Sequence, residues 1–278
     1  MSQVAPLLSA RLSVEYPNKR SVLHDIVLEI SAGEILGLVG ESGSGKSTLA
    51  LALLQLLREK GGKVIGEINF QGEDLLKKNE KQLRAIRGRA ISVVLQSPIT
   101  SLNPALSIGA QLKEAWRAHA RGSNDMGDTA IKSALESVCS PCDEGFLRKR
   151  PSQISVGQGQ RVIIAMAILH RPSLLIADEA TSALDAITQS EILDLFRRLN
   201  QQLGMAILYI SHDLLSVAAL CERVAILNEG GIVECGTASQ IFGAPRHPYT
   251  RRLVGALPKR PIGATPSDLD NEIVPSMV

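Results

Sequence analysis

The stretch Gly40-Glu41-Ser42-Gly43-Ser44-Gly45-Lys46-Ser47-Thr48 decides the fold of this chain. It follows the apolar run 35–39, which is typical of a buried strand, and precedes the apolar run 49–54, which is typical of a helix. Glycines in this setting let successive backbone N–H groups point at one polyphosphate, and the start of the helix adds further free amides. The stretch therefore predicts a phosphate-binding loop, with Lys46 at the outer phosphates and the Ser47 hydroxyl on Mg²⁺.

The composition predicts a globular protein that does not bind nucleic acid. The chain has 278 residues, of which 45% are hydrophobic, so it can bury the core of one or two domains. Its net charge is only +2 and aromatic residues make up 3%, which leaves neither a basic surface nor stacking rings for nucleic acid. Because residues 1–10 lack the pattern of a secretory signal, we expect a cytoplasmic protein whose cysteines, including Cys139 and Cys142, are free thiols.

Two kinds of strand pattern predict two sheets. The segments 7–16, 22–30 and 66–70 alternate apolar and polar residues, which favours a three-stranded antiparallel sheet. Continuous apolar runs favour a buried parallel sheet with helices on both faces. These runs are 34–39, 90–95, 173–177, 206–210 and 223–227. Between residues 97 and 155 the helical spacing of 108–119 and 128–138 predicts a helical insertion.

Two carboxylates follow one of the apolar runs, at the edge where ligands gather in open parallel sheets. Asp178 is predicted to bind the magnesium shell, and Glu179 to polarise a water for attack on the outermost phosphate. Taken alone, the pair would be explained equally well by the preference of acidic residues for a helix start. The glycine loop favours the first interpretation.

Gln96 and His212 lie at the ends of two further strands. Gln96 follows the run 90–95, and His212 follows the run 206–210 with Ser211 between them. Because the carboxyl ends of parallel strands meet at one edge of a sheet, we expect both side chains near the same bound nucleotide. A single polar residue at a strand end is usually structural, so it is the combination that carries the prediction.

The order of these motifs resembles that of the ATP-binding cassette (ABC) ATPases. The shared elements are the glycine loop, Gln96, Ile154-Ser155-Val156-Gly157-Gln158-Gly159-Gln160-Arg161, Asp178-Glu179, Ser182-Ala183-Leu184-Asp185 and His212. The resemblance implies an α/β fold of the P-loop NTPase (RecA-like) type, a parallel sheet core with an antiparallel β subdomain and an inserted α-helical subdomain. It implies an ATPase domain at 1–257, with the core at 1–96 and 156–245 and the helical subdomain at 97–155. We expect the tail, 258–278, to be disordered.

The resemblance also implies ATP and Mg²⁺ as cofactors, in a site shared with a second ABC ATPase subunit. The Ser155 segment, before a long helix predicted to begin near Gly159, would grip the nucleotide held by the partner's glycine loop. The implied catalytic residues are Glu179, His212 and Gln96, and the implied metal ligands are Ser47, Gln96 and Asp178. The implied nucleotide contacts are Tyr16, Gly40, Glu41, Ser42, Gly43, Ser44, Gly45, Lys46, Ser47, Thr48, Ser155, Gly157, Gln158 and Asp185.

Two stretches narrow the resemblance to the dipeptide, oligopeptide and nickel importer ATPases. They are Ser97-Pro98-Ile99-Thr100-Ser101-Leu102-Asn103-Pro104 and His247-Pro248-Tyr249-Thr250-Arg251-Arg252-Leu253. This implies ATP hydrolysis that powers uptake of a peptide, nickel or a related small solute, by a protein peripheral on the inner face of the cell membrane. The implied partners are integral membrane permease subunits and, indirectly, a solute-binding protein.

Two departures from the family pattern leave alternatives open. The family more usually has Gly at the position of Val156, and Gln or Arg at that of Gly159. A β-branched Val stiffens the loop and could crowd the nucleotide, and a helical Gly costs up to about 1 kcal/mol relative to Ala. A catalytically weak regulatory subunit is therefore one competing interpretation. A soluble ABC ATPase without a transport role is another, independent of these departures.

Overall fold

The computed structural model describes residues 5–17, 19–120 and 124–257, so the tail expected to be disordered lies outside the described residues. The strands are β1 (Leu8–Tyr16), β2 (Lys19–Ile30), β3 (Ile35–Val39), β4 (Lys63–Phe70), β5 (Glu73–Asp74), β6 (Ile91–Val94), β7 (Leu174–Asp178), β8 (Ala206–Ser211), β9 (Arg223–Asn228) and β10 (Gly231–Thr237). They form a four-stranded sheet in the order β2-β1-β4-β5 and a six-stranded sheet in the order β10-β9-β3-β8-β7-β6.

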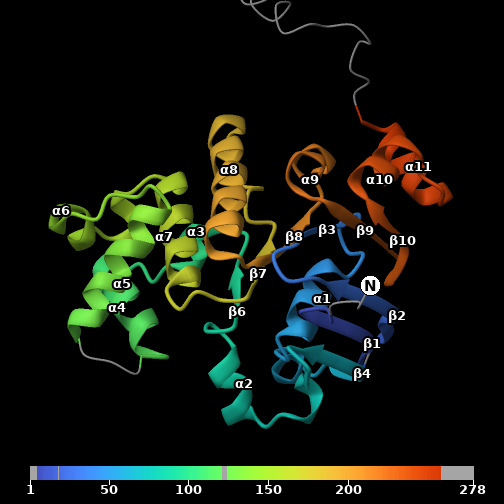
Figure 1. Ribbon diagram of the computed structural model, residues 1–278, viewed down its shortest axis with the longest axis horizontal. Coiled ribbons are helices and arrows are strands. Elements are labelled where there is room, and N and C mark those ends of the chain that lie inside the picture. Colours follow the sequence, from blue (N-terminus) through green and yellow to red (C-terminus); the bar gives the residue numbers. More distant parts are fainter. Residues whose placement is uncertain (1–4, 18, 121–123, 258–278) are drawn as a thin grey trace, which may run out of the picture.

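The helices are grouped around the six-stranded sheet. They are α1 (Lys46–Leu53), α2 (Glu80–Ile86), α3 (Pro98–Ser101), α4 (Ile108–Arg117), α5 (Asn124–Ser137), α6 (Glu144–Arg148), α7 (Val156–Ile168), α8 (Ala186–Leu203), α9 (Leu214–Leu220), α10 (Ala238–Gly243) and α11 (Pro248–Gly255). Helices α4 to α7 gather on one side of the molecule, and the four-stranded sheet, α10 and α11 lie on the other (Figure 1). None of the helices in the described residues has the length and apolar character needed to cross a membrane.

The six-stranded sheet is parallel apart from its edge strand β10, which turns back on β9 through a hairpin at 228–231. In register, Val39 of β3 lies opposite Ser211 of β8, and Asp178 of β7 lies opposite Ile210. The strands that carry the glycine loop, the two carboxylates and His212 therefore end together. The prediction of a buried parallel sheet is confirmed.

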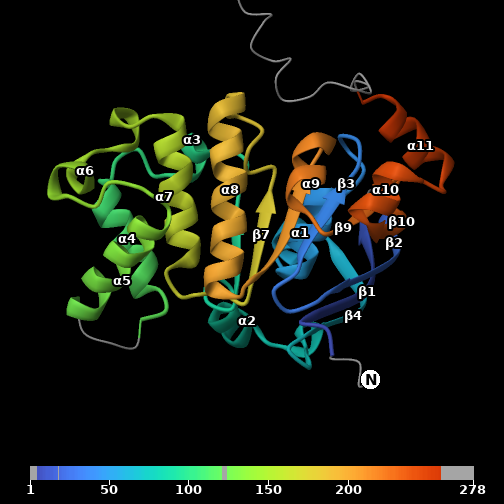
Figure 2. The same cartoon turned by 45° about the horizontal axis from the view of Figure 1, so that its top comes forward.

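Alternate residues of each buried strand belong to different halves of the core. In β3, Ile35 and Val39 pack into the apolar cluster that contains α7 and α8, whereas Leu36 and Leu38 pack into the cluster that contains α1 and the four-stranded sheet. Figure 2 shows α8 and α9 lying over one face of the sheet. Each fully buried Leu or Ile contributes roughly 1.5–3 kcal/mol. Burial on both faces is why these strands are apolar throughout rather than alternating.

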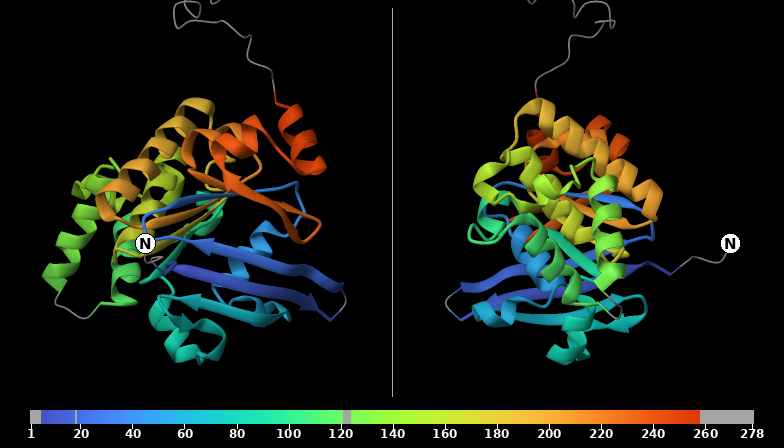
Figure 3. Two further views of the ribbon diagram at one scale, coloured as in Figure 1. Left: turned by 45° about the vertical axis from the view of Figure 1, so that its right-hand side comes forward. Right: turned by 90° about the vertical axis from the view of Figure 1, so that its left-hand side faces the viewer.

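The antiparallel sheet has one strand more than predicted. β1 pairs with β2 and β4 as its alternating pattern requires, and Figure 3 shows these strands as a separate layer beneath the parallel sheet. The short β5 adds to β4 through two residue pairs. A two-residue strand has no periodicity, so the sequence pattern could not reveal it.

Helix α7 begins at Val156, so the prediction of a start near Gly159 was wrong by three residues. Ser155 is the N-cap: its Oγ accepts from Gln158 N at 3.2 Å, and Gln158 Oε1 accepts from Ser155 N at 3.1 Å. This reciprocal cap satisfies two amide donors and fixes the start. Gly159 then lies inside the helix, where a Cβ would come within 3.2 Å of Pro98 Cβ, so glycine allows the close approach of α3.

Candidate nucleotide-binding site

The loop between β3 and α1 brings bare backbone to the end of the parallel sheet. A Cβ on Gly40 would lie 2.2 Å from the Leu227 carbonyl oxygen and 2.7 Å from Ser44 Oγ, so only glycine fits there. Gly43 and Gly45 have φ of +81° and +110°, a region that glycine enters without steric cost. Gly45 is the N-cap of α1, and a glycine cap has no side chain to occupy the first amides of the helix, which can then face an anion.

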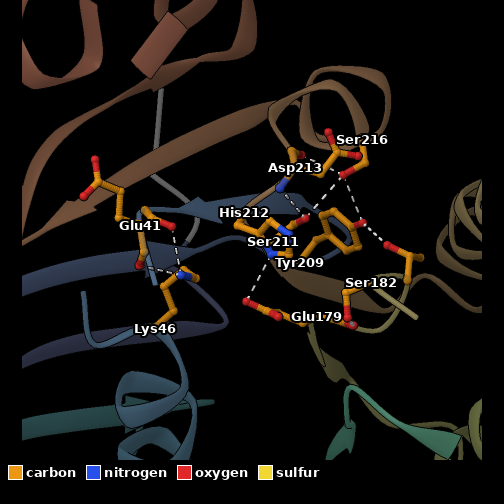
Figure 4. Close-up of polar contacts among 11 residues, drawn as sticks. Glu41, Lys46, Glu179, Ser182, Tyr209, Ser211, His212, Asp213 and Ser216 are labelled. Atoms are coloured by element: carbon orange, nitrogen blue, oxygen red, sulfur yellow. Dashed lines mark hydrogen bonds and ion pairs between the residues drawn. The ribbon is translucent and has the colours of Figure 1, made fainter. Parts of the chain in front are cut away.

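Lys46 is 5% exposed and is held by the loop itself. Its Nζ donates to the carbonyl oxygens of Gly40, at 2.8 Å, and Glu41, at 2.9 Å (Figure 4). Burial lowers the pKa of Lys46, while the negative charges of Glu179 and Asp178 act in the opposite direction. The ammonium group therefore lies in a partly desolvated position, where a bound phosphate would stabilise its charge.

Asp178 ends β7 with one carboxylate oxygen free. Burial raises the pKa of Asp178, against the opposing effects of a hydrogen bond with Ser47 and the charge of Lys46. Its Oδ1 is buried and has no hydrogen-bond partner among the described residues. A free carboxylate oxygen beside a serine hydroxyl is the kind of oxygen donor set that Mg²⁺ binds, so these residues fit the implied metal.

Glu179 directly follows Asp178 in the chain, and its side chain faces His212. Its φ of +50° is rare for a residue with a side chain, and its N–H donates to the Ile210 carbonyl oxygen at 2.9 Å. The Glu179 Oε1 lies 3.3 Å from His212 Nδ1, and the two side chains are 21% and 57% exposed respectively. Figure 4 shows the pair beside Lys46.

A cavity of about 1050 Å³ opens in front of the glycine loop. Its lining residues are Tyr16, Pro17, Val22, Ser42, Gly43, Gly45, Lys46, Ser47, Thr48, Lys60, Gly61, Gln96 and Glu179. Tyr16 and Gln96, which the sequence placed at the site on weak individual signals, are thus brought to the loop. Lys60 and Gly61 were not predicted, although the paired glycines 61–62 after a basic residue are a usable turn signal.

The Ser155 segment lies apart from this cavity: among the described residues, its lining includes none of Ser155, Gly157, Gln158 and Asp185. Asp185 caps α8 by accepting from Thr188 N at 2.9 Å and from Thr188 Oγ1 at 2.8 Å, and these hydrogen bonds lower the pKa of Asp185. A Cβ on Gly157 would meet Thr188 Cγ2 at 2.9 Å, so the starts of α7 and α8 are adjacent. They form a second surface, distinct from the glycine loop.

A buried hydroxyl network behind Glu179 was missed by sequence reasoning. Tyr209, in β8, shares a 2.9 Å hydrogen bond with Thr181 and donates to Ser216 at 3.2 Å, and burial raises its pKa (Figure 4). Ser182 Oγ donates to the Glu179 carbonyl oxygen at 3.0 Å. The network ties the segment after Glu179 to β8. Its members come from separate elements, so no local sequence pattern predicts the network.

Comparison with known families and proteins agrees with this arrangement. A model of the family described as ABC transporter matches residues 23–182, and a model of the oligopeptide/dipeptide transporter C-terminal region matches residues 233–276. The glutathione import ATP-binding protein GsiA of Salmonella choleraesuis (strain SC-B67) is 42% identical over 243 residues, which are 85% of this chain and 39% of that protein. GsiA of Escherichia coli (strain K12) is 40% identical over 247 residues, 87% and 40% of the two chains. The chain thus spans about two fifths of the length of these relatives.

Solved structures share the fold. CbiO1 of Clostridium perfringens, part of the ABC transporter complex cbiONQ, superposes with a TM-score of 0.75 at 26% identity and covers 87% of this chain and 92% of its own. The dimeric ATP-binding cassette MJ0796, bound to ADP and Pi, has a TM-score of 0.72 at 26% identity, with coverages of 83% and 98%. The predicted P-loop NTPase fold class is confirmed. Because the ABC transporter model covers more than half of the chain, and relatives at 40–42% identity span 85–87% of it, the chain belongs to the ABC transporter family.

Proposed function

We propose that the chain is the ATP-binding and ATP-hydrolysing subunit of an import system for a peptide, nickel or a related small solute. One observation carries the proposal: Lys46, Asp178, Glu179 and His212, from three separate segments, meet at one edge of the sheet, while the Ser155 surface lies elsewhere. A site divided in this way needs a second subunit. The glutathione import relatives and the match to the oligopeptide/dipeptide transporter C-terminal region support a solute of the peptide class.

Each residue has a distinct part in hydrolysis. The loop amides and Lys46 would bind the phosphates, with Tyr16 against the adenine, and Ser47, Asp178 and Gln96 would hold Mg²⁺. Mg²⁺, when bound, withdraws charge from the outer phosphates. The Glu179 carboxylate would orient a water and take its proton. His212, 3.3 Å from that carboxylate, would contact the terminal phosphate and keep Glu179 in place.

A second ABC ATPase subunit, the same or a related chain, would complete the site. Its Ser155, Gly157 and Gln158 would meet the outer phosphate, and its Asp185 would lie at the same interface. Val156, the departure in this segment, is the first residue of α7 and is 38% exposed. Closure is favoured because ATP contacts both subunits only in the closed form.

The membrane partners would be integral permease subunits, with a solute-binding protein engaged through them and the chain on the inner face of the cell membrane. We propose that residues 97–155, as a helical subdomain, transmit the closure. A groove of about 260 Å³ between β6 and α7 offers an apolar docking surface. The apolar residues that line it are Leu54, Leu56, Ile91, Val93, Ile163, Met166 and Ala167, and Arg87, Gly88, Ser92 and Ser101 complete the lining.

The Glu179→Gln substitution tests the proposal. Glutamine keeps the shape of the side chain but cannot take a proton, so the variant should bind Mg·ATP, lose steady-state hydrolysis and accumulate as a nucleotide-bound dimer. The measurements are phosphate release and size-exclusion chromatography with light scattering. Glu144→Gln, an 84% exposed carboxylate on α6, is the matched control and should hydrolyse like the wild type.

This variant and three measurements on the wild-type protein separate the competing interpretations. Unchanged hydrolysis in the Glu179→Gln variant would refute the assignment of Glu179 as the base. A wild-type protein that binds Mg·ATP but hydrolyses it only beside a related ATPase subunit would indicate a regulatory subunit. Co-purification with membrane subunits in mild detergent supports the importer, whereas tight nucleic-acid binding at moderate salt favours a soluble ABC ATPase.

A further inference from the structure

Tyr249 joins the C-terminal helix α11 to the glycine loop. Its phenolic oxygen accepts a hydrogen bond from the Glu41 backbone N–H at 3.2 Å, across 208 positions of sequence. The ring is 5% exposed and packs in the core cluster that also contains Val39, the last residue of β3. The hydroxyl group therefore reaches the loop from a buried and fixed position.

The start of α11 is anchored to the parallel sheet. Glu234, on β10, accepts from Arg246 N at 2.8 Å and from His247 N at 3.0 Å. His247 is the N-cap, and its Nδ1 accepts from Tyr249 N at 3.2 Å, with Pro248 as the first helical residue. Both the chain before the helix and its first turn are thus held by hydrogen bonds, which limits how Tyr249 can move.

Both backbone polar groups of Glu41 are bound by side chains. Its N–H donates to Tyr249, and its carbonyl oxygen accepts from Lys46 Nζ at 2.9 Å. The Glu41 N–H belongs to the Gly40–Glu41 peptide, whose carbonyl oxygen, on Gly40, accepts from Lys46 Nζ at 2.8 Å, so Tyr249 holds one side of a peptide whose other side positions the lysine. We propose that Tyr249, on the C-terminal helix α11, is a positioning residue for nucleotide binding: its hydrogen bond to Glu41 fixes the conformation of the glycine loop. This proposal rests on the function proposed above.

The position of Tyr249 dictates which kinetic constant should respond. The loop would grip the phosphates equally before and during the reaction, so its misplacement removes uniform binding, which raises KM and leaves kcat unchanged. A purely structural role for Tyr249 would instead lower the active fraction and the melting temperature, and kcat would fall. The two roles can therefore be told apart.

The Tyr249→Phe substitution is the test, because it keeps the buried ring and removes only the hydroxyl group. We expect the Kd for Mg·ATP by calorimetry, and the KM for hydrolysis, to rise about threefold to tenfold, the range that one neutral hydrogen bond corresponds to. The kcat and the melting temperature without nucleotide should stay at the wild-type values. Hydrogen exchange of the Glu41 amide should become faster in the free protein.

Gly255→Ala is the control on the same helix and should bind like the wild type. Gly255 is the last residue of α11, and an added Cβ there would meet nothing within 4 Å. Wild-type affinity in the Tyr249→Phe variant, or an equal loss in both variants, would overturn the proposal. Should Tyr249→Phe fail to fold, Glu234→Gln must weaken binding for the proposal to stand. A wild-type protein that does not bind Mg·ATP would refute the proposed function itself, a separate result.

Discussion

Replacing Gly40 by alanine is the sharpest test of how the glycine loop works. The added Cβ would lie 2.2 Å from the Leu227 carbonyl oxygen, about 1.2 Å closer than the 3.4 Å at which ordinary contact begins. The obstacle is the backbone of β9, which is held inside the parallel sheet and cannot give way. The glycine loop therefore has to move. Overpacking of this kind costs about 1–3 kcal/mol of folding free energy.

The larger effect should fall on nucleotide binding. A shift of about an ångström moves the loop amides away from the phosphates, and each lost hydrogen bond to a charged group costs about 1.5–3 kcal/mol, or roughly tenfold to a hundredfold in Kd. The assay is calorimetric titration with Mg²⁺ and a non-hydrolysable ATP analogue, beside urea unfolding of the same samples. Gly243→Ala is the control, since a Cβ there would meet nothing within 4 Å.

Two results would contradict this reasoning. If Gly40→Ala binds the analogue as tightly as the wild type, the contact with Leu227 does not set the loop conformation. If Gly243→Ala loses as much affinity as Gly40→Ala, the loss reflects a general loss of stability. In the expected outcome, only Gly40→Ala is impaired in nucleotide binding, and its binding free energy changes by more than its free energy of unfolding.

Two further predictions concern titratable groups away from the loop. Burial raises the pKa of the Cys221 thiol, so alkylation of the native protein near pH 8 should modify the exposed Cys139 and Cys235, and mass spectrometry should find Cys221 modified only after unfolding. Burial alone would raise the pKa of Glu234, but the Thr250 side chain and the Arg246 and His247 amides, as hydrogen-bond donors, lower that pKa below the ordinary value of a glutamate. Its contribution to stability is therefore present above pH 4.5 and is lost as the pH falls through the lowered pKa. The stability gap between wild type and Glu234→Gln should close in acid urea titrations; a gap independent of pH would refute the assignment.

The catalytic side of the site could be predicted from sequence because its signals are local. The glycine loop, with its strand and helix, occupies a short continuous stretch, and each of the other predicted residues lies within two positions of the end of an apolar run. These residues are Asp178, Glu179, Gln96 and His212. Parallel pairing then brings the strand ends together, which the registers of β3, β7 and β8 confirm.

The features that were missed depend on contacts between distant parts of the chain. The hydrogen bond from Glu41 to Tyr249 spans 208 positions, and the hydroxyl network of Tyr209 joins three separate elements. The start of α7 was misplaced because the Ser155–Gln158 cap outweighs the low helix propensity of Gly159. None of these three features produces a periodic pattern of hydrophobic residues in the sequence.

The sequence by itself determined the fold class, the family resemblance and the residue types at the phosphate end of the site, because backbone conformation and burial impose the order of glycines, apolar runs and charges. Only the tertiary structure decided which side chains share a cavity, that Asp178 keeps a free oxygen beside Ser47, and that the Ser155 surface lies outside that cavity. The physical reason is that these properties are distances between groups far apart in the chain, and such distances exist only once the sheet has formed.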